Sequence, residues 1–318
     1  MQTFRDLIAA NKRNSILLVV IFVLFTTLVF LVIGLAILAY VIPDAIGTMD
    51  VVHAFVAGLV AFGIALLLAW LGYSSGDGMV LAVSGARAIQ HRDDPELFNV
   101  VEEMAIAAGV PMPRVFLIDD TATNAFATGR DPKHAAVAIT RGLRMKLTRD
   151  ELQGVMAHEM AHIRNFDIRL MLLLAVLVGA IVMLADLFMR ILWYGGGRSR
   201  RSRDDKGGGL IVVVLMIVAI ILAIIAPILA QLIQLAVSRQ REYLADASAV
   251  EFTRYPLGLA NALRKIDADP EVLETANRGT AHLYIANPIK KFEARASSMF
   301  SSHPPIKDRI ARLEALAR

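Results

Sequence analysis

Four long apolar runs limit the folds open to this chain more than any other feature of its sequence. Residues 16–42 and 51–72 contain no Asp, Glu, Lys or Arg, and the runs at 168–194 and 210–237 are of similar length. A helix crosses the hydrocarbon core of a bilayer with about 20 apolar residues. Composition agrees, because 56% of the residues are apolar and only 19% charged, whereas soluble domains have about half and a quarter. We therefore expect about four transmembrane helices, the first an uncleaved anchor.

The third run contains an acid and a base, Asp186 and Arg190, four residues apart. This spacing places both side chains on one helix face, where they can form an ion pair. Charges are costly at membrane depth, so we expect the pair to lie near a helix end, with Arg190 reaching toward the interface.

Basic residues near the runs predict the orientation in the membrane, because Lys and Arg collect in cytoplasmic segments. The loop 43–50 contains only the acids Asp44 and Asp50. The basic flanks lie elsewhere, at Lys12, Arg13, Arg164, Arg169, Arg239 and Arg241. This bias predicts a cytoplasmic N-terminus and cytoplasmic polar segments. The basic loop "GGGRSRRSRDDKGGG" at 195–209 opposes this orientation, because it would lie outside the cytoplasm if the last two runs both cross the membrane. Whether these two runs cross fully is therefore left open, and the sequence assigns the loop no role.

The polar remainder, 74–167 and 238–318, predicts one mixed domain interrupted by the last two apolar runs. Asp94 before Pro95 marks a helix start, and Gly109 marks its end. Three short runs of β character follow, "RVFLID", "TNAFATG" and "HAAVAIT". Further helices are predicted at 238–252, 256–266 and 306–317.

The stretch "GVMAHEMAHIRNFD" carries the candidate chemistry. A capping box of Thr148 and Glu151 predicts the start of its helix. Positions i and i+4 project from one helix face, so His158 and His162 can bind one ion, with Glu159 beside it to hold a water. The chain has no cysteine, so a metal site here must use His, Asp and Glu. The pattern predicts one zinc ion per chain.

A catalytic zinc needs a third protein ligand, and "SRQREYLADASAV" offers the best candidate, Glu242. Two apolar runs separate it from His162, so both fall on the same side of the membrane. Asp246, one turn later, can accept a hydrogen bond from a ligating histidine. His282 and His303 remain competing third ligands.

This set of residues predicts hydrolysis of a peptide bond. Zinc lowers the pKa of a bound water, and Glu159 takes its proton and passes it to the leaving amine. A substrate peptide can add as a strand to an exposed sheet edge, and we expect "TNAFATG" to form that edge. The net charge of +4 suits basic membrane flanks better than a nucleic-acid surface, so no nucleic-acid partner is expected.

Several motifs together resemble one known family. "HEMAH", "SRQREYLAD", "TNAFATG", "AHLYIANP" and "SSHPPIKDRI" occur in an order similar to that of the HtpX family of bacterial membrane-bound zinc metalloproteases, gluzincins related to the CAAX prenyl endopeptidases. The resemblance covers essentially the whole chain, including the two N-terminal apolar runs.

The resemblance implies zinc ligands at His158, His162 and Glu242, with Glu159 as the base. It implies that the segment of Asn124, Ala125, Phe126 and Ala127 binds substrate, and that His303 and Arg309 approach the zinc. His303 would occupy the open position or steady the tetrahedral intermediate; Arg309 would assist or pair with an acid. The implied activity is proteolytic quality control of misfolded membrane proteins in the bacterial inner membrane, with polypeptides and the lipid bilayer as partners.

The predicted fold class is α+β: a helical membrane protein with about four transmembrane segments and a mostly helical, zincin-like catalytic domain bearing a small β-sheet. The expected parts are an N-terminal membrane anchor (1–73), the first part of the catalytic domain (74–167), a transmembrane hairpin (168–237) and the second part (238–318).

Three alternatives stay open. A non-catalytic membrane scaffold would bind zinc structurally, with His303 as a permanent fourth ligand, or not at all. A prenyl-protein endopeptidase has closer chemistry, although its enclosure by more spans is missing. Site-2-type intramembrane proteolysis would need the HExxH motif inside a span, which the polar flanks of 148–167 oppose.

Overall fold

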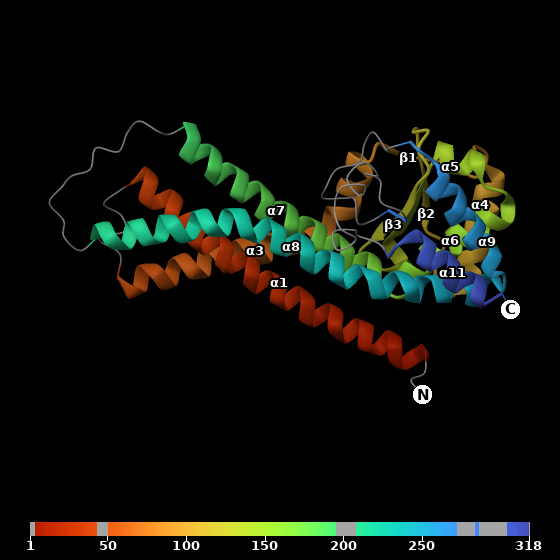
Figure 1. Ribbon diagram of the computed structural model, residues 1–318, viewed down its shortest axis with the longest axis horizontal. Helices are drawn as coiled ribbons and strands as arrows, with labels where there is room; N and C mark the ends of the chain where they lie inside the picture. Colours follow the sequence, from red (N-terminus) through yellow and green to blue (C-terminus); the bar gives the residue numbers. More distant parts are fainter. Residues whose placement is uncertain (1–3, 43–49, 195–207, 272–283, 286–303, 318) are drawn as a thin grey trace. The chain divides into compact units, whose positions relative to one another are not determined.

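A computed structural model describes residues 4–42, 50–194, 208–271, 284–285 and 304–317 (Figure 1). These residues form two compact units. The polar unit comprises Met1–Ser15, Tyr73–Leu173 and Ile233–Arg318, and the span unit comprises Ile16–Gly72 and Leu174–Leu232. The chain is mostly helical with one small mixed sheet, as the sequence predicts.

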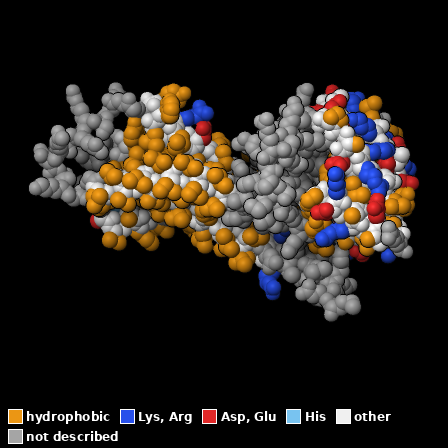
Figure 2. Space-filling model, viewed as in Figure 1, with side chains coloured by type: hydrophobic (Ala, Val, Ile, Leu, Met, Phe, Trp, Pro, Cys, Tyr) orange, Lys and Arg blue, Asp and Glu red, His pale blue; other side chains and the backbone are white. Residues whose placement is uncertain are grey.

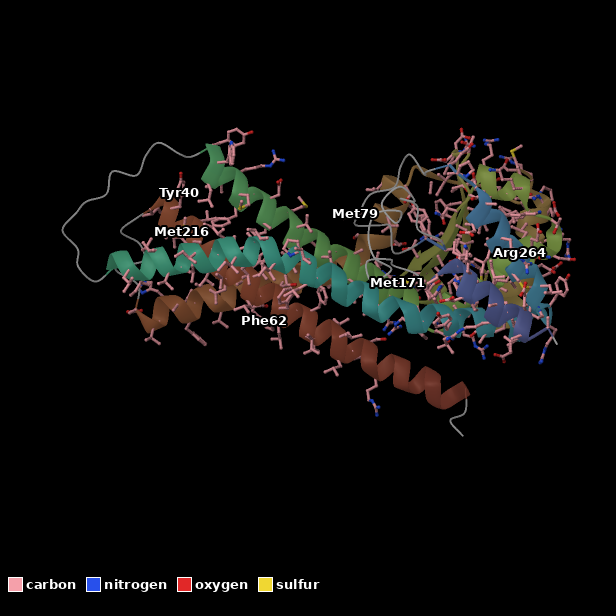
Figure 3. All side chains as sticks on the ribbon, viewed as in Figure 1. Tyr40, Phe62, Met79, Met171, Met216 and Arg264 are labelled. Atoms are coloured by element: carbon pink, nitrogen blue, oxygen red, sulfur yellow. The ribbon has the colours of Figure 1, made fainter. Side chains whose placement is uncertain are left out.

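Four helices are long and apolar enough to cross a membrane. They are α1 (Phe4–Val41), α3 (Val51–Val83), α7 (Asp167–Tyr194) and the first half of α8 (Gly208–Thr253). Large apolar side chains such as Phe62 and Trp70 are exposed on them, and apolar atoms cover the visible surface of the span unit (Figures 2 and 3). The expected pair is confirmed, since Arg190 Nε lies 2.7 Å from Asp186 Oδ2. The chain is therefore a multi-pass membrane protein.

Helix α8 corrects one prediction, because the fourth apolar run and the expected helix 238–252 form one continuous helix. No Gly or Pro lies between Pro227 and Pro256, so nothing in the backbone ends the helix at the change from apolar to polar side chains. One element thus leads from a candidate span to Glu242.

The polar unit contains a four-stranded sheet of order β1-β2-β4-β3. Its strands are β1 (Ala86–Ala88), β2 (Arg114–Ile118), β3 (Ala125–Gly129) and β4 (Ala135–Thr140). β2 and β4 are parallel, and the other two pairs are antiparallel. The last three strands confirm the three β-like runs, whereas the three-residue β1 was not predicted. Strand β3 lies at the sheet edge, as expected for "TNAFATG".

Helices α4 (Pro95–Ala108), α5 (Arg141–Lys146), α6 (Arg149–Arg164), α9 (Pro256–Ala268) and α11 (Ile306–Ala315) complete the polar unit, with a 3-10 turn, η1 (Pro132–His134). The predicted caps are confirmed. Asp94 Oδ1 accepts from the backbone N–H of Leu97 at 3.0 Å, Gly109 ends α4 with φ 68°, and Thr148 and Glu151 form the capping box of α6.

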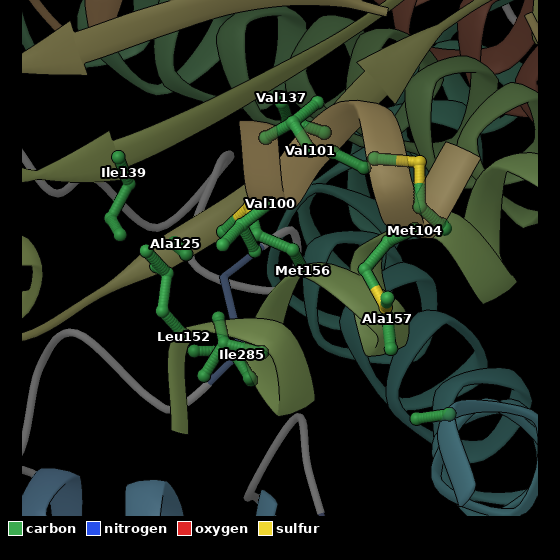
Figure 4. Packing of buried hydrophobic residues seen from close by; sticks show 14 of the residues in the cluster. Val100, Val101, Met104, Ala125, Val137, Ile139, Leu152, Met156, Ala157 and Ile285 are labelled. Carbon is green, nitrogen blue, oxygen red and sulfur yellow. The ribbon is translucent and has the colours of Figure 1, made fainter. Parts of the chain in front are cut away.

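The core of the polar unit buries the helix that carries the HExxH motif. Val100, Val101 and Met104 of α4 pack with Leu152 and Met156 of α6 (Figure 4). On the other side of α6, Gly154 approaches α9 so closely that a Cβ there would lie 2.5 Å from the backbone N of Leu259. Helix α6 is therefore fixed on two sides.

Candidate metal centre

Helix α6 presents two buried histidines to one point. His158 is fully buried and His162 is 5% exposed. Their Nε2 atoms lie 3.2 Å apart, as the i, i+4 spacing predicts for one helix face. The capping box fixes the start of α6, and α4 and α9 pack along its sides.

Glu242 of α8 completes the group. Its Oε1 lies 3.4 Å from His162 Nε2 and its Oε2 lies 3.6 Å from His158 Nε2. One ligand atom from each of the three residues falls within 4.8 Å of the others. The structure therefore brings together the three residues singled out as zinc ligands from two distant parts of the sequence.

The spacing of these atoms fits a tetrahedral ion. Metal–ligand distances of about 2.0–2.2 Å give tetrahedron edges of about 3.3–3.6 Å. The two Nε2 atoms lie 3.2 Å apart, and each has a different oxygen of Glu242 at 3.4 or 3.6 Å, so the separations are close to these edges. The donor set, two imidazoles and a carboxylate, is one that catalytic zinc uses. Three protein ligands leave a fourth position for water.

Asp246 orients the ring of His158 through its Nδ1 atom, and Arg309 in turn binds Asp246. Its Nδ1 lies 3.0 Å from Asp246 Oδ1, and Arg309 binds the two oxygens of Asp246 at 2.9 and 2.7 Å. A carboxylate only accepts, so Nδ1 carries the proton and Nε2 keeps its lone pair for the metal. The predicted position of Asp246 behind a ligating histidine matches this contact. We name this series of contacts the His158 relay.

His162 is held by a second series of the same kind, which sequence reasoning missed. Its Nδ1 lies 3.2 Å from Asp167 Oδ2, while Arg241 donates to Asp167 Oδ1 and, at 2.8 Å, to Ser15 Oγ. Asp167 and Arg241 are buried. We name this series the His162 relay. Its signal is chemical, because every metal-binding histidine is expected to donate its other N–H, and Asp167 lies five residues after His162.

Arg309 does more than pair with Asp246. Its Nη1 lies 3.1 Å from Glu242 Oε2 and donates to the carbonyl oxygen of Ile285 at 2.9 Å. The side chain is fully buried. Of the two roles considered for it, pairing with an acid is the one its contacts support, and it acts as a positioning residue for Glu242 and Asp246.

Glu159 lies beside the three ligands and is 1% exposed. Burial raises the pKa of its carboxyl to about 7, although the backbone N–H of Ala127 donates to it and opposes the shift. A carboxyl with a pKa near neutrality can both take and return a proton.

The pKa values of His158 and His162 shift in opposite directions. Burial lowers the pKa of His158, because charging it in the core is costly. Burial acts on the pKa of His162 in the same direction, but Asp167 and Glu242 both accept from its ring and raise it to about 10. In the absence of a metal, the site therefore favours the protonated, positively charged form of His162 next to Glu242.

Four buried carboxylates and two buried guanidiniums surround the point between the ligands in the described part of the chain. They are Glu159, Asp167, Glu242 and Asp246, with Arg241 and Arg309. With neutral histidines, this set carries two more negative than positive charges when all the acids are ionised. A divalent cation would balance that excess, which is a second, independent fit to zinc.

The predicted substrate segment forms the edge strand, but its edge is partly covered. Ala125 O accepts from the backbone N–H of Ile285 at 2.8 Å, and the rings of Phe126 and Tyr284 lie 5.0 Å apart. Asn124, Ala125, Phe126 and Ala127 are all buried. Ala127, whose N–H reaches Glu159, is the member of this segment that contacts the candidate catalytic group. His282, His303 and residues 195–207 of the basic loop lie outside the described residues.

Comparison with known proteins finds related sequences. The sequence profile of Peptidase family M48 matches residues 91–317. A "Protease HtpX homolog" from Ligilactobacillus salivarius is 45% identical over 96% of this chain and 98% of its own length, and one from Dictyoglomus thermophilum is 44% identical over 99% and 95%. The crystal structure of S. mikatae Ste24p aligns with a TM-score of 0.48 and 21% identity, over 91% of this chain and 64% of that one.

Proposed function

Because this chain belongs to peptidase family M48, we propose that its buried His158, His162 and Glu242 hold one catalytic zinc ion, and that it is an endopeptidase. At the level its relatives share, the chain is a multi-pass membrane metalloprotease. The observation that carries the finer proposal is the convergence of three ligand atoms within 4.8 Å beside a buried glutamate.

When bound, zinc supplies a lowered pKa for water and polarises the peptide carbonyl. Glu159 accepts the proton of the attacking water and delivers it to the leaving nitrogen, for which its pKa of about 7 is well matched. The two relays keep Nδ1 of each histidine protonated and the rings oriented. Ala127 N–H steadies the carboxylate of Glu159.

We propose that the substrates are polypeptide segments of misfolded or damaged membrane proteins. The four candidate spans support this, because they confine the protease to the bilayer and so favour cleavage of chains that share it. A peptide can extend the sheet at β3 beyond Phe126, or along all of β3 if Tyr284 and Ile285 move away from it.

Glu159→Gln tests the chemistry. We expect it to retain one zinc per chain and to lose cleavage of casein by the full-length protein in detergent. The matched control is Glu102→Gln, an exposed glutamate on α4, which should cleave at the wild-type rate. Zinc at unit stoichiometry with no turnover in the wild type would instead leave the non-catalytic scaffold.

We propose that the polar unit faces the cytoplasm of a bacterial inner membrane, from the distribution of Lys and Arg. The absence of native cysteine allows a direct test. A membrane-impermeant maleimide added to spheroplasts should label a cysteine placed at Asp50 but not one placed at exposed Lys307. The reverse pattern would contradict the orientation and leave the catalytic proposal intact.

A further inference from the structure

A basic cavity lies apart from the metal centre, where the sheet meets the end of α3. Its volume is about 350 Å³, and it is lined by Ser74, Asp77, Met112, Arg114, Arg130, Lys133, His134 and Ala135. Cavities that bind small molecules measure about 300–1,000 Å³. All of these residues belong to the polar unit, and none takes part in the metal centre.

The cationic side chains that line the cavity are only partly paired with carboxylates among the described residues. Arg114 pairs with Asp77 at 2.6 Å, and His134 Nδ1 lies 2.8 Å from Asp131 Oδ1. Arg130 reaches Asp131 only at 3.8 Å. Within the described ranges no carboxylate lies in ion-pair distance of Lys133. Arg130 and Lys133 therefore remain available to an anion.

Helix α3 contains the apolar run 51–72 and, directly after it, two residues that line the cavity. Residues 51–73, at a rise of roughly 1.5 Å each, cover about 34 Å, slightly more than the hydrocarbon thickness of about 30 Å. Trp70, which is 60% exposed, and Tyr73 mark the interface at this end. Ser74 and Asp77 follow within about one turn of the same helix, so we expect these two residues near the lipid phosphates.

The segment Arg130–His134 is held by Arg169, which also contacts Tyr73. Arg169, at the start of α7, donates to the carbonyl oxygen of Arg130 at 2.8 Å, and its guanidinium lies 5.8 Å from the centre of the Tyr73 ring. The turn after β3 is thus tied to Arg169, near the start of α7, and through it to Tyr73 of α3. A cationic cavity next to residues that follow an apolar run is suited to a phosphate attached to a lipid.

We propose that this cavity binds the phosphate headgroup of an anionic phospholipid, with Lys133 and Arg130 as its main contacts. Arg114 and His134 border the headgroup, and Met112, which is 40% exposed, offers an apolar contact for the glycerol region. Basic cavities beside transmembrane helices favour anionic headgroups on electrostatic grounds. The proposal does not depend on the proposed proteolysis.

The test uses full-length, zinc-loaded protein delipidated in detergent. Binding of dioctanoyl phosphatidylglycerol, dioctanoyl phosphatidylcholine and inorganic phosphate is measured separately by native mass spectrometry. We expect phosphatidylglycerol to bind best. One cation near a membrane surface changes affinity about fivefold, so Arg130→Ala should weaken binding about fivefold and the charge reversal Lys133→Glu about 25-fold.

Lys307→Glu is the matched control, because Lys307 is equally exposed but lies on α11, which packs on α9 away from this cavity. It should bind phosphatidylglycerol as the wild type does. Zinc content and melting temperature identify variants that fold. Equal binding of both lipids, or unchanged binding by folded Lys133→Glu, would overturn the proposal. Inorganic phosphate binding as tightly as the lipid would also overturn it, by assigning the cavity to a soluble anion.

Discussion

Asp167→Asn should weaken zinc binding and destabilise the fold through two different partners. The carboxylate accepts from His162 with Oδ2 and from Arg241 with Oδ1. An amide of the same shape has one oxygen, so it can accept from only one of them and presents N–H groups to the other. It also leaves the buried Arg241 without its negative charge.

The two effects have different expected sizes. Loss of the group behind a metal-binding histidine reduces metal affinity about 10–100-fold, which is about 1.4–2.7 kcal/mol. A buried charge left uncompensated destabilises by about 3–5 kcal/mol. The second effect acts through Arg241 alone. The double variant Asp167→Asn, Arg241→Met should therefore recover most of the stability while zinc affinity stays low.

Two measurements separate these effects: competition for zinc with a chelator of known affinity, and thermal unfolding of the zinc-free protein. Asp119→Asn is the control, since Asp119 forms an exposed pair with Arg141 that should be worth less than about 1 kcal/mol. If the double variant regains zinc affinity together with stability, Asp167 serves only to neutralise Arg241 and the orienting role is wrong. Wild-type zinc affinity in Asp167→Asn would refute the His162 relay outright.

Three further predictions concern packing, capping and the metal. Gly154→Ala should destabilise the fold by about 1–3 kcal/mol, because its Cβ meets the backbone of Leu259, whereas Gly179→Ala, with open space, should cost little in the same thermal scan. Asp94→Ala should lower the free energy of unfolding by about 1 kcal/mol at pH 7. Burial tends to raise the pKa of Asp94, but Arg144 and the N–H of Leu97 lower it overall. Its stabilisation is therefore present above about pH 4 and disappears as the pH falls through the lowered pKa, so the variant and the wild type should converge in stability at acidic pH. Zinc at 100 times its Kd should stabilise the wild type by about 2.7 kcal/mol, and Glu242→Ala should show much less of this shift.

Local signals in the sequence predicted the parts of the fold that depend on neighbouring residues. The Asp94 cap, the Thr148 capping box and the β character of the three longer strands each depend on a few neighbouring residues, and each was confirmed. β1 was not predicted because three residues are too short a run to show β character. The continuity of α8 was not predicted because the side chains change from apolar to polar along it, although no helix-breaking residue lies at that change.

Contacts between distant segments were harder to predict. Glu242 and Asp246 lie far from the HExxH motif in sequence, and only the known chemistry of zinc sites suggested that they converge on it. The same chemistry gave no reason to select Arg241, since an arginine at a helix surface and one buried against Asp167 look alike in sequence. Coverage of Ala125 by Ile285 has no sequence signal at all, because an isolated bridge needs no pattern.

The placement of charge explains why His158 is backed by an acid and a base together. An aspartate alone would stabilise the protonated imidazole and so compete with the metal for the ring nitrogen. An arginine on that aspartate offsets the effect, as its contribution to lowering the pKa of His158 illustrates. The Asp246–Arg309 pair is then neutral behind His158, and the excess negative charge of the site is left to Glu159 and Glu242, beside the proposed zinc position. Arg309 also bridges Asp246 and Glu242, one turn apart on α8, so α11 fixes the position of a metal ligand without contributing one.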